Sequence, residues 1–186
     1  SVDTRKSAVA RAAVAAGAGL INDVSGFDFD PALAAFVAES GLPVCVMHAQ
    51  GVPATMQDNP RYDDVLLDVY DALAARVARA EAAGIARDRI IVDPGIGFGK
   101  TRAHNLAILN RIGLFHALGC AILLGVSRKR FIGEVAGIGD PSLRAPGTLG
   151  VSHAAVGQGV QMHRVHDVAS VRQGLALWRA VTERTE

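Results

Sequence analysis

Residues 121–132 read Ala-Ile-Leu-Leu-Gly-Val-Ser-Arg-Lys-Arg-Phe-Ile, an apolar run that passes directly into hydroxyl and basic side chains. The run Ala121–Leu124 predicts a short buried strand, and the residues after it indicate the start of a helix. Such a junction brings Ser127, Lys129 and a helix N-terminus around one point, which suits an anionic or electron-rich ligand. In isolation, Ser-Arg-Lys is more often a solvated basic turn that ends a strand.

The same layout, a short apolar strand with a polar tip, occurs five more times along the chain. These segments are Ser1–Thr4, Leu20–Val24, Val44–His48, Ile90–Pro94 and Val160–Asp167. Ala-rich helical segments separate them, and one helix carries an i, i+4 apolar stripe of Val65, Val69, Leu73 and Val77. The alternation of strands and helices predicts an α/β fold with a parallel sheet.

The number of predicted βα units indicates which α/β architecture the chain adopts. Six βα units in a single domain over residues 1–186 fit a TIM (β/α)₈ barrel, in which functional groups sit at the C-terminal ends of the strands. Because such barrels typically take about 250 residues, we expect an N-terminally truncated barrel with about six units. The chain also begins at Ser1, without a methionine and within strand-like sequence. An open doubly wound sheet is the competing architecture, and spacing alone does not exclude it.

The composition is that of an ordinary globular protein, with 50% hydrophobic and 20% charged residues. A net charge of +1 gives no general reason to expect nucleic acid or an anionic membrane as a partner. No apolar run reaches membrane-spanning length, and no signal-peptide pattern is visible. Cys45 and Cys120 have no motif spacing, which predicts buried thiols rather than a disulfide framework.

Polar side chains collect at the predicted strand ends. Asp3, Asn22 and Asp93 each end a strand with a hydrogen-bonding group, and each alone would commonly be a helix cap or a turn residue. Because side chains alternate along a strand, Arg164 and His166 should point the same way and Val165 the opposite way. An Arg–His pair at a strand tip can bind phosphate or pyrophosphate. Together these groups predict a ligand pocket.

Two further patterns are rejected. The segment Gly95–Thr101 resembles a P-loop, but three residues separate Gly95 from Gly99 where that motif has four, and it does not match the dinucleotide fingerprint either. A Gly-rich loop after a strand still allows a ligand close to the backbone. His163 and His166 should lie on opposite faces of a strand, so the sequence predicts no metal cluster in this chain.

Six motifs occur in the order found in one enzyme family. They are Ser-Val-Asp-Thr (1–4), Ile-Asn-Asp (21–23), Val-Met-His-Ala-Gln-Gly-Val-Pro-Ala-Thr-Met-Gln (46–57), Asp-Pro-Gly-Ile-Gly-Phe-Gly-Lys (93–100), Gly-Val-Ser-Arg-Lys (125–129) and Arg-Val-His-Asp (164–167). Over its whole length the chain resembles the dihydropteroate synthases, folate-synthesis enzymes that sulfonamides target. The resemblance implies a (β/α)₈ transferase that condenses 6-hydroxymethyl-7,8-dihydropterin pyrophosphate with p-aminobenzoate and releases pyrophosphate. It also implies Mg²⁺ bound with the pyrophosphate, a homodimer and a cytoplasmic location.

The resemblance also assigns roles to residues. Asp3, Asn22 and Asp93 would form the polar wall of a pterin pocket, because their oxygens can accept the N–H groups of the ring. The implied catalytic residues are Asp93, Lys129, Arg164 and His166, with Asp93 stabilising a cationic pterin methylene and the Arg–His pair stabilising the departing anion. The residues implied to bind substrates are Asp3, Asn22, Met47, Asp93, Phe98, Gly125, Ser127, Lys129, Arg130, Arg164 and His166.

The chain departs from the family pattern in two ways. Arg130 stands where the family often has a serine that helps hold the p-aminobenzoate carboxylate, and it could pair with that carboxylate or point into solvent. The first two βα units, with the family's metal-binding asparagine and two mobile loops, are not in the sequence, so we expect little activity from this chain alone. Two alternatives remain open: a pterin-binding methyltransferase domain, which has no pyrophosphate to bind, and a non-catalytic pterin- or phosphate-binding module.

Overall fold

The structure is a computed structural model that describes residues 1–51, 56 and 58–182. Its strands are β1 (Val2–Asp3), β2 (Ile21–Asp23), β3 (Val44–Met47), β4 (Ile90–Asp93), β5 (Ala121–Leu124) and β6 (Met162–His163). Its α-helices are α1 (Ser7–Ala15), α2 (Ala32–Ser40), α3 (Val65–Ala82), α4 (Arg102–Asn110), α5 (Arg130–Ala136), α6 (Ala145–Val156) and α7 (Val168–Thr182). Short 3₁₀ helices cover Arg87–Arg89, Ile112–Leu118 and Pro141–Arg144.

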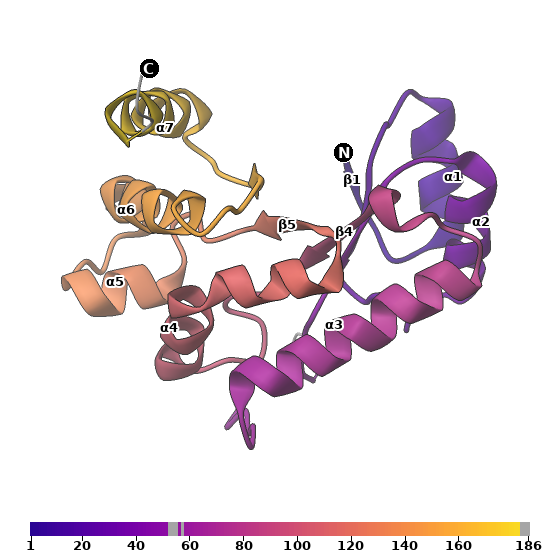
Figure 1. Ribbon diagram of the computed structural model, residues 1–186, viewed down its shortest axis with the longest axis horizontal. Coiled ribbons are helices and arrows are strands. Elements are labelled where there is room, and N and C mark those ends of the chain that lie inside the picture. Colours follow the sequence, from indigo (N-terminus) through magenta and orange to yellow (C-terminus); the bar gives the residue numbers. More distant parts are fainter. Residues whose placement is uncertain (52–55, 57, 183–186) are drawn as a thin grey trace.

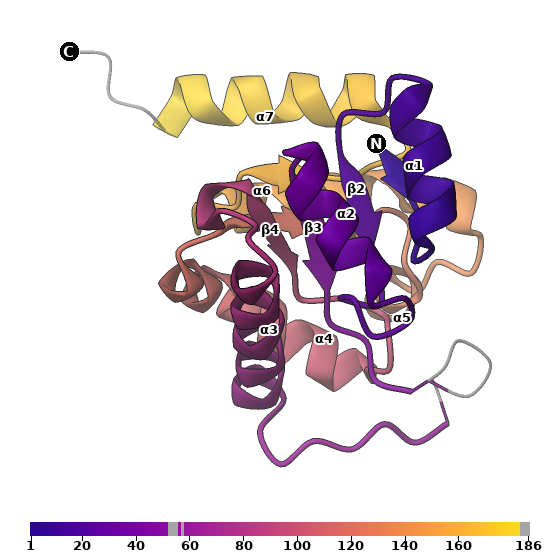
Figure 2. The same cartoon turned by 90° about the vertical axis from the view of Figure 1, so that its right-hand side faces the viewer.

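All neighbouring strands are parallel, and their order in the sheet is β1-β2-β3-β4-β5-β6. A doubly wound sheet reverses its strand order at a switch point, and this sheet does not. The strands curl at the centre with the helices outside them (Figure 1), and the turned view shows the same arrangement (Figure 2). The prediction of a partial (β/α)₈ barrel with six units is therefore confirmed.

Most apolar side chains pack between the strands and the surrounding helices. Val44, Val46, Ile90 and Val92 belong to this outer layer, together with Leu73 of α3, which is fully buried. Burial of one such leucine contributes about 1.5–3 kcal/mol. The i, i+4 stripe of α3 thus packs against the strands as predicted.

Along each strand, the side chains that alternate with this outer layer face the inside of the curl. Cys45, Ile91 and Leu123 form a separate small apolar cluster there, with Met162 packed against it. The alternation of side chains along β1 to β4 puts Asp3, Asn22, Met47 and Asp93 on the same inner face. Both cysteines are buried free thiols, as expected.

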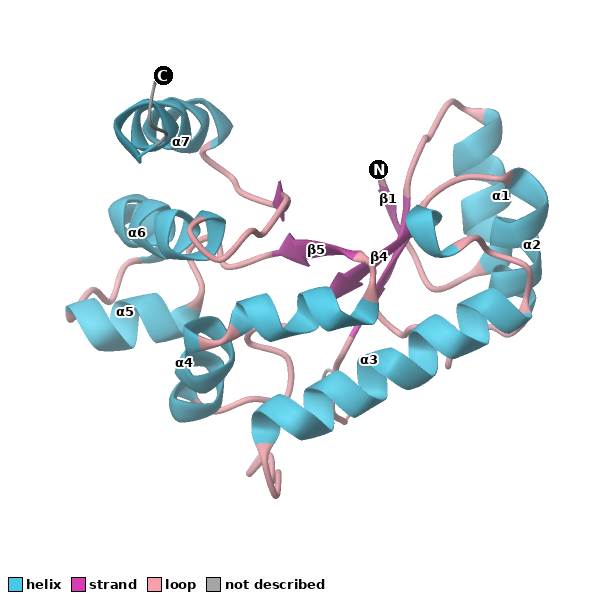
Figure 3. Cartoon of the chain, viewed as in Figure 1, coloured by secondary structure: helices cyan, strands magenta, loops and turns pink. Residues whose placement is uncertain are grey.

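One strand is shorter than the sequence predicts, and the last helix is only partly covered. The strand predicted over Val160–Asp167 is limited to Met162–His163. Before its start, the Gln161 side-chain oxygen rather than a backbone carbonyl accepts the Ile122 N–H at 2.9 Å, and after its end the Arg164 N–H still donates to the Leu124 carbonyl at 3.0 Å. In the last helix, apolar residues at positions 171, 175, 178 and 181 share one face. Of that face Val171 is buried, whereas Val181 is 81% exposed, since α7 packs mainly on α6 and lies away from the strands (Figure 3). No helix among the described residues is long and apolar enough to cross a membrane.

Candidate functional site

The predicted polar wall lies on the inner face at the C-terminal ends of β1, β2 and β4. Asn22 Nδ2 donates to Asp3 Oδ2 over 2.9 Å, and the same Asp3 oxygen lies 3.3 Å from Arg164 Nη1. Asn22 is buried, and its other polar atom, Oδ1, has no hydrogen-bond partner among the described residues. A buried acceptor without a donor is uncommon and costly, so this oxygen is free to accept a donor from a ligand.

Asp93 is the second buried acceptor of this wall. One of its oxygens accepts the Gly95 N–H at 2.7 Å, which turns the chain sharply after β4. Burial raises the pKa of the Asp93 carboxyl, and the positive charge of Lys129, the Gly95 N–H and Arg164 oppose that rise. Burial lowers the pKa of Lys129 to about 8, against the opposing effect of Asp93. The two side chains therefore form an electrostatically coupled pair in the interior.

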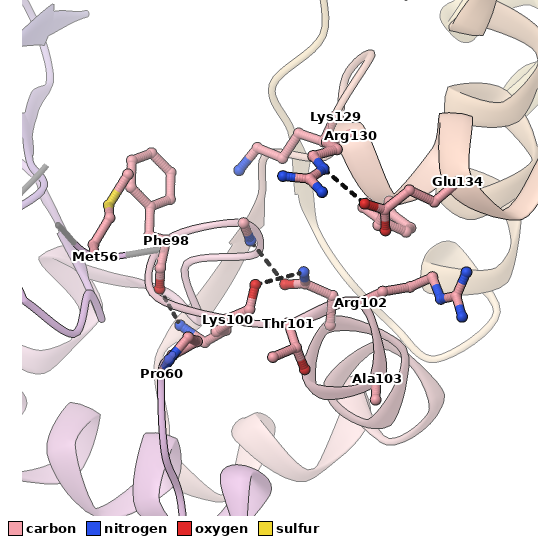
Figure 4. Close-up of a pocket in the computed structure, with 13 residues that line it drawn as sticks. Met56, Pro60, Phe98, Lys100, Thr101, Arg102, Ala103, Lys129, Arg130 and Glu134 are labelled. Atoms are coloured by element: carbon pink, nitrogen blue, oxygen red, sulfur yellow. Dashed lines mark hydrogen bonds and ion pairs between the residues drawn. The ribbon is translucent and has the colours of Figure 1, made fainter. Parts of the chain in front are cut away.

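The Gly-rich segment after β4 meets Lys129 at a cavity of about 770 Å³. Lys129 Nζ donates to the Ile96 carbonyl and lies 4.6 Å from the centroid of the Phe98 ring. Figure 4 shows the ammonium directed toward the aromatic ring from the opposite wall of the cavity. A cation and an aromatic ring that face one cavity suit an aromatic ligand with a negative group.

Arg130 lines the same cavity, at the start of α5. Its side chain is 85% exposed, and Nε pairs with Glu134 one turn later at 2.6 Å (Figure 4). Arg130 thus reaches the cavity edge largely in solvent, with its charge paired with a carboxylate of its own helix, and its pairing with the p-aminobenzoate carboxylate is still a prediction. Exposed i, i+4 pairs are worth only about 0.3–0.5 kcal/mol, so the guanidinium can exchange partners at little cost.

A second cavity, of about 410 Å³, is lined by Gly125, Ser127, Lys129, Arg164, Val165 and His166. Ser127 Oγ accepts the His166 N–H at 3.0 Å and lies 2.7 Å from the Nδ1 atom of its ring. The predicted Arg164–His166 pair is thus together. β6 ends at His163, so both residues lie in the loop that follows rather than in a strand. Val165, between them, also lines a separate cavity of about 690 Å³ together with His163, which Arg164 and His166 do not line.

Arg128, between Ser127 and Lys129, has a structural role. It adopts a positive φ of 58°, and its guanidinium binds Asp167 through two hydrogen bonds of 2.7 and 3.1 Å. This pair ties the tip of β5 to the residues after β6. Gly125 lies beside Arg164, and a Cβ atom at Gly125 would come 3.4 Å from Arg164 Nη2, so a larger residue would crowd that guanidinium.

Met47 lines neither of the two cavities just described. It is 1% exposed, it pairs with Asp93 in the β3–β4 register, and it lines a smaller cavity of about 180 Å³ together with Phe98. Residues 52–55 and 57 of the motif 46–57 lie outside the described residues. Within the described ranges, no group of three or more His, Cys, Asp or Glu side chains could hold a metal ion. The residues in hand therefore do not fit a protein-bound magnesium site.

Three buried polar residues near the site were missed by sequence reasoning. Lys100 is 3% exposed and His48 is 7% exposed, and the Lys100 Nζ atom lies 2.8 Å from His48 Nδ1. Asn105 of α4 is also buried, and its Oδ1 accepts the Gly97 N–H at 2.8 Å. Lys100 stood out only as the lysine of a rejected P-loop, and nothing in the sequence indicates a partner 52 positions earlier.

A parallel βα barrel with carboxylate and amide acceptors inside and cations at the C-terminal ends of its strands is typical of an enzyme with its active site at that end. The chain belongs to the pterin binding enzyme family, whose profile matches residues 1–166. It is 42% identical to dihydropteroate synthase of Escherichia coli strain K12 over all 186 of its residues, which cover 65% of that relative. The chain thus spans slightly less than two thirds of the length of this curated relative.

Solved structures agree with this relationship. The crystal structure of dihydropteroate synthase from Stenotrophomonas maltophilia, with imidazole in its active site, matches 99% of the chain and 69% of its own length. The TM-score is 0.94 at 44% identity. The Xanthomonas albilineans enzyme in complex with 7,8-dihydropteroate matches 99% of the chain and 67% of its own length, with a TM-score of 0.91 at 42% identity.

Proposed function

We propose that this chain carries the substrate sites of a dihydropteroate synthase. In the reaction, the C–O bond of 6-hydroxymethyl-7,8-dihydropterin pyrophosphate breaks and pyrophosphate leaves. The amine nitrogen of p-aminobenzoate then forms the new C–N bond and loses a proton, which gives 7,8-dihydropteroate. The observation that carries the proposal is the free, buried Oδ1 of Asn22 beside Asp3 and Asp93 in a member of the pterin binding family.

The pterin binds along the inner polar wall. The ring presents several N–H donors, and Asn22 Oδ1 and the Asp93 carboxylate are acceptors that bulk water does not already satisfy. Positive charge develops on the pterin as pyrophosphate leaves. The carboxylate of Asp93 stabilises that charge more strongly in the buried site than it would in water.

The leaving pyrophosphate binds in the 410 Å³ cavity, which Arg164, His166 and Ser127 line. The Arg164 guanidinium is already within 3.3 Å of Asp3, so the carboxylate fixes its direction toward the pterin wall. The magnesium ion implied by the family resemblance would enter with the pyrophosphate. We assign it no step, because the described residues provide no ligand group for it.

The aromatic amine binds in the 770 Å³ cavity between Phe98 and Lys129. The ring of p-aminobenzoate packs on Phe98, and its carboxylate faces Lys129 and Arg130. Met47 contributes an apolar wall behind Phe98. Sulfonamides would compete here because they share the aniline ring. We further propose that the whole protein acts in the cytoplasm as a homodimer.

The test is formation of 7,8-dihydropteroate by a chimera that supplies, from the Escherichia coli relative, the part this chain does not cover. Turnover that falls at least about a hundredfold in Asp93→Ala, but not in the exposed control Asp88→Ala, supports the proposal. The chain without the added part is assayed in parallel, and we expect little turnover from it. Equal turnover by the Asp93→Ala variant and the unaltered chimera would refute the assignment.

A further inference from the structure

The Gly-rich segment 94–99 leaves β4 in a conformation that few sequences could adopt. Gly95, Gly97 and Gly99 all have positive φ values, between 61° and 82°. A Cβ at Gly95 would lie 1.8 Å from the His48 carbonyl oxygen, and one at Gly99 would lie 2.4 Å from the Gln50 carbonyl oxygen. The segment therefore packs directly on the backbone that follows β3.

Lys100 lies under this segment, away from solvent. Its Nζ atom donates to the carbonyls of Gly95 at 3.0 Å and Phe98 at 3.1 Å, and lies 2.8 Å from His48 Nδ1. An ammonium group has three hydrogens and no acceptor, so all three are used by these partners. His48 must then be neutral, with its proton on Nε2 and the Nδ1 lone pair directed at Lys100.

His48 itself is fixed by the sheet. Its backbone N–H donates to the Asp93 carbonyl at 3.0 Å, which extends the β3–β4 pairing by one residue. Lys100 thus joins a fixed point at the end of β3 to two carbonyls of the Gly-rich segment. From the other side, Asn105 binds the Gly97 N–H and Tyr62 donates to the Gly99 carbonyl at 2.7 Å.

On the side of the Gly-rich segment opposite Lys100, the same residues face the cavity next to Lys129. The Phe98 ring and the Ile96 carbonyl both meet Lys129 at the 770 Å³ cavity. Lys100 binds the Phe98 carbonyl, so it acts on the same residue whose ring faces the cavity (Figure 4). Lys100 also lines the cavity wall, but its ammonium hydrogens are all directed at protein acceptors.

We propose that Lys100, held by His48, is a positioning residue for the aromatic-amine subsite, fixing the segment that presents Phe98 to Lys129. This inference rests on the proposed function for the identity of the amine. It predicts a selective effect, because the hydrogen bonds of Asp3 and Asn22 do not involve the segment, and Asp93 meets it only through the Gly95 N–H. Loss of Lys100 should weaken use of the aromatic amine and leave pterin binding nearly unchanged.

The experiment uses Lys100→Met, which keeps the chain length but removes the charge and all three donors. Lys6→Met, at an exposed lysine, is the matched control. In the chimera described above, Lys100→Met should raise KM for p-aminobenzoate about tenfold or more, because charge-assisted hydrogen bonds are lost. The affinity for the pterin should stay within about twofold of the value for the unaltered chimera. Unchanged KM for p-aminobenzoate, or equal weakening of both substrates, would overturn the proposal.

Hydrogen exchange of the 186-residue chain separates this proposal from the proposed function. Lys100→Met should accelerate exchange of the amides of residues 95–99, whose protection the contacts above provide, and Lys6→Met should not. His48→Asn keeps a hydrogen-bond acceptor near the position of Nδ1 and should retain more protection than His48→Phe. Accelerated exchange in a chimera without turnover would refute the proposed function alone. Exchange that Lys100→Met leaves unchanged would refute the positioning role.

Discussion

Asn22→Leu should separate ligand binding from stability more sharply than any other single change. Leucine has nearly the shape of asparagine but neither of its polar groups. In the free protein the substitution removes the 2.9 Å bond to Asp3, and it also removes a buried oxygen that has no partner among the described residues. The first loss costs about 1.5–3 kcal/mol, whereas relief of the unsatisfied oxygen returns about 1–3 kcal/mol.

Asp3 tolerates the loss of its partner. Its side chain is 59% exposed and keeps Arg164 at 3.3 Å, so water can replace the amide. We therefore expect the free energy of unfolding, measured by urea denaturation, to change by less than about 1 kcal/mol. Asn110→Leu, at an exposed position on α4, is the matched control.

Pterin binding should respond very differently. A bound pterin N–H would lose its acceptor inside the protein, at a cost of about 1–3 kcal/mol, or roughly 5- to 150-fold in Kd. Calorimetric titration with 6-hydroxymethylpterin measures this value. Unchanged affinity would show that Asn22 does not face the ligand, and destabilisation well above 3 kcal/mol would show that its oxygen was already satisfied.

Further expectations follow from the same structure. Leu73→Ala should lower the free energy of unfolding by about 2–5 kcal/mol in urea, against little change for exposed Leu67→Ala. Arg164→Ala should weaken calorimetric pyrophosphate binding about tenfold or more relative to exposed Arg11→Ala, and equal affinities would place the anion elsewhere. Burial lowers the pKa of Lys100 to about 7 from 10.5. Between these two values folded Lys100 therefore binds fewer protons than unfolded Lys100, so the free energy of unfolding should rise with pH across that window. Below the window, the destabilisation caused by burying the charged ammonium is present in full. Lys129, with a pKa of about 8, adds to the same trend, so Lys100→Met should reduce the slope in urea titrations without abolishing it.

The elements that sequence reasoning placed well are those with a strong local signal. The strand Ile90–Asp93 and the apolar stripe of α3 agree with the structure, because a short continuous apolar run predicts a buried strand and an i, i+4 stripe predicts an amphipathic helix. Asp3, Asn22 and Asp93 were found because strand ends in a parallel sheet meet at one edge. Their functional roles are still predictions, as is the assignment of residues 1–186 to one partial domain.

What the sequence did not reveal depends on contacts between distant segments. Lys100 and His48 are 52 positions apart, and their pairing exists only once β3 and β4 are adjacent. At the start of β6 the Gln161 side chain, rather than the backbone, binds the Ile122 N–H, a contact between distant segments that no propensity scale anticipates. The apolar face of α7 is buried at Val171 and exposed at Val181, because periodicity shows that a face is apolar but does not show what covers it.

The crystal structure of this chain with 6-hydroxymethylpterin bound tests the central claim most directly. The account predicts the ring against β1, β2 and β4, with a pterin nitrogen about 2.7–3.2 Å from Asn22 Oδ1 and a second near Asp93. A pterin bound elsewhere, or an Asn22 Oδ1 that still lacks a donor in the complex, would contradict it.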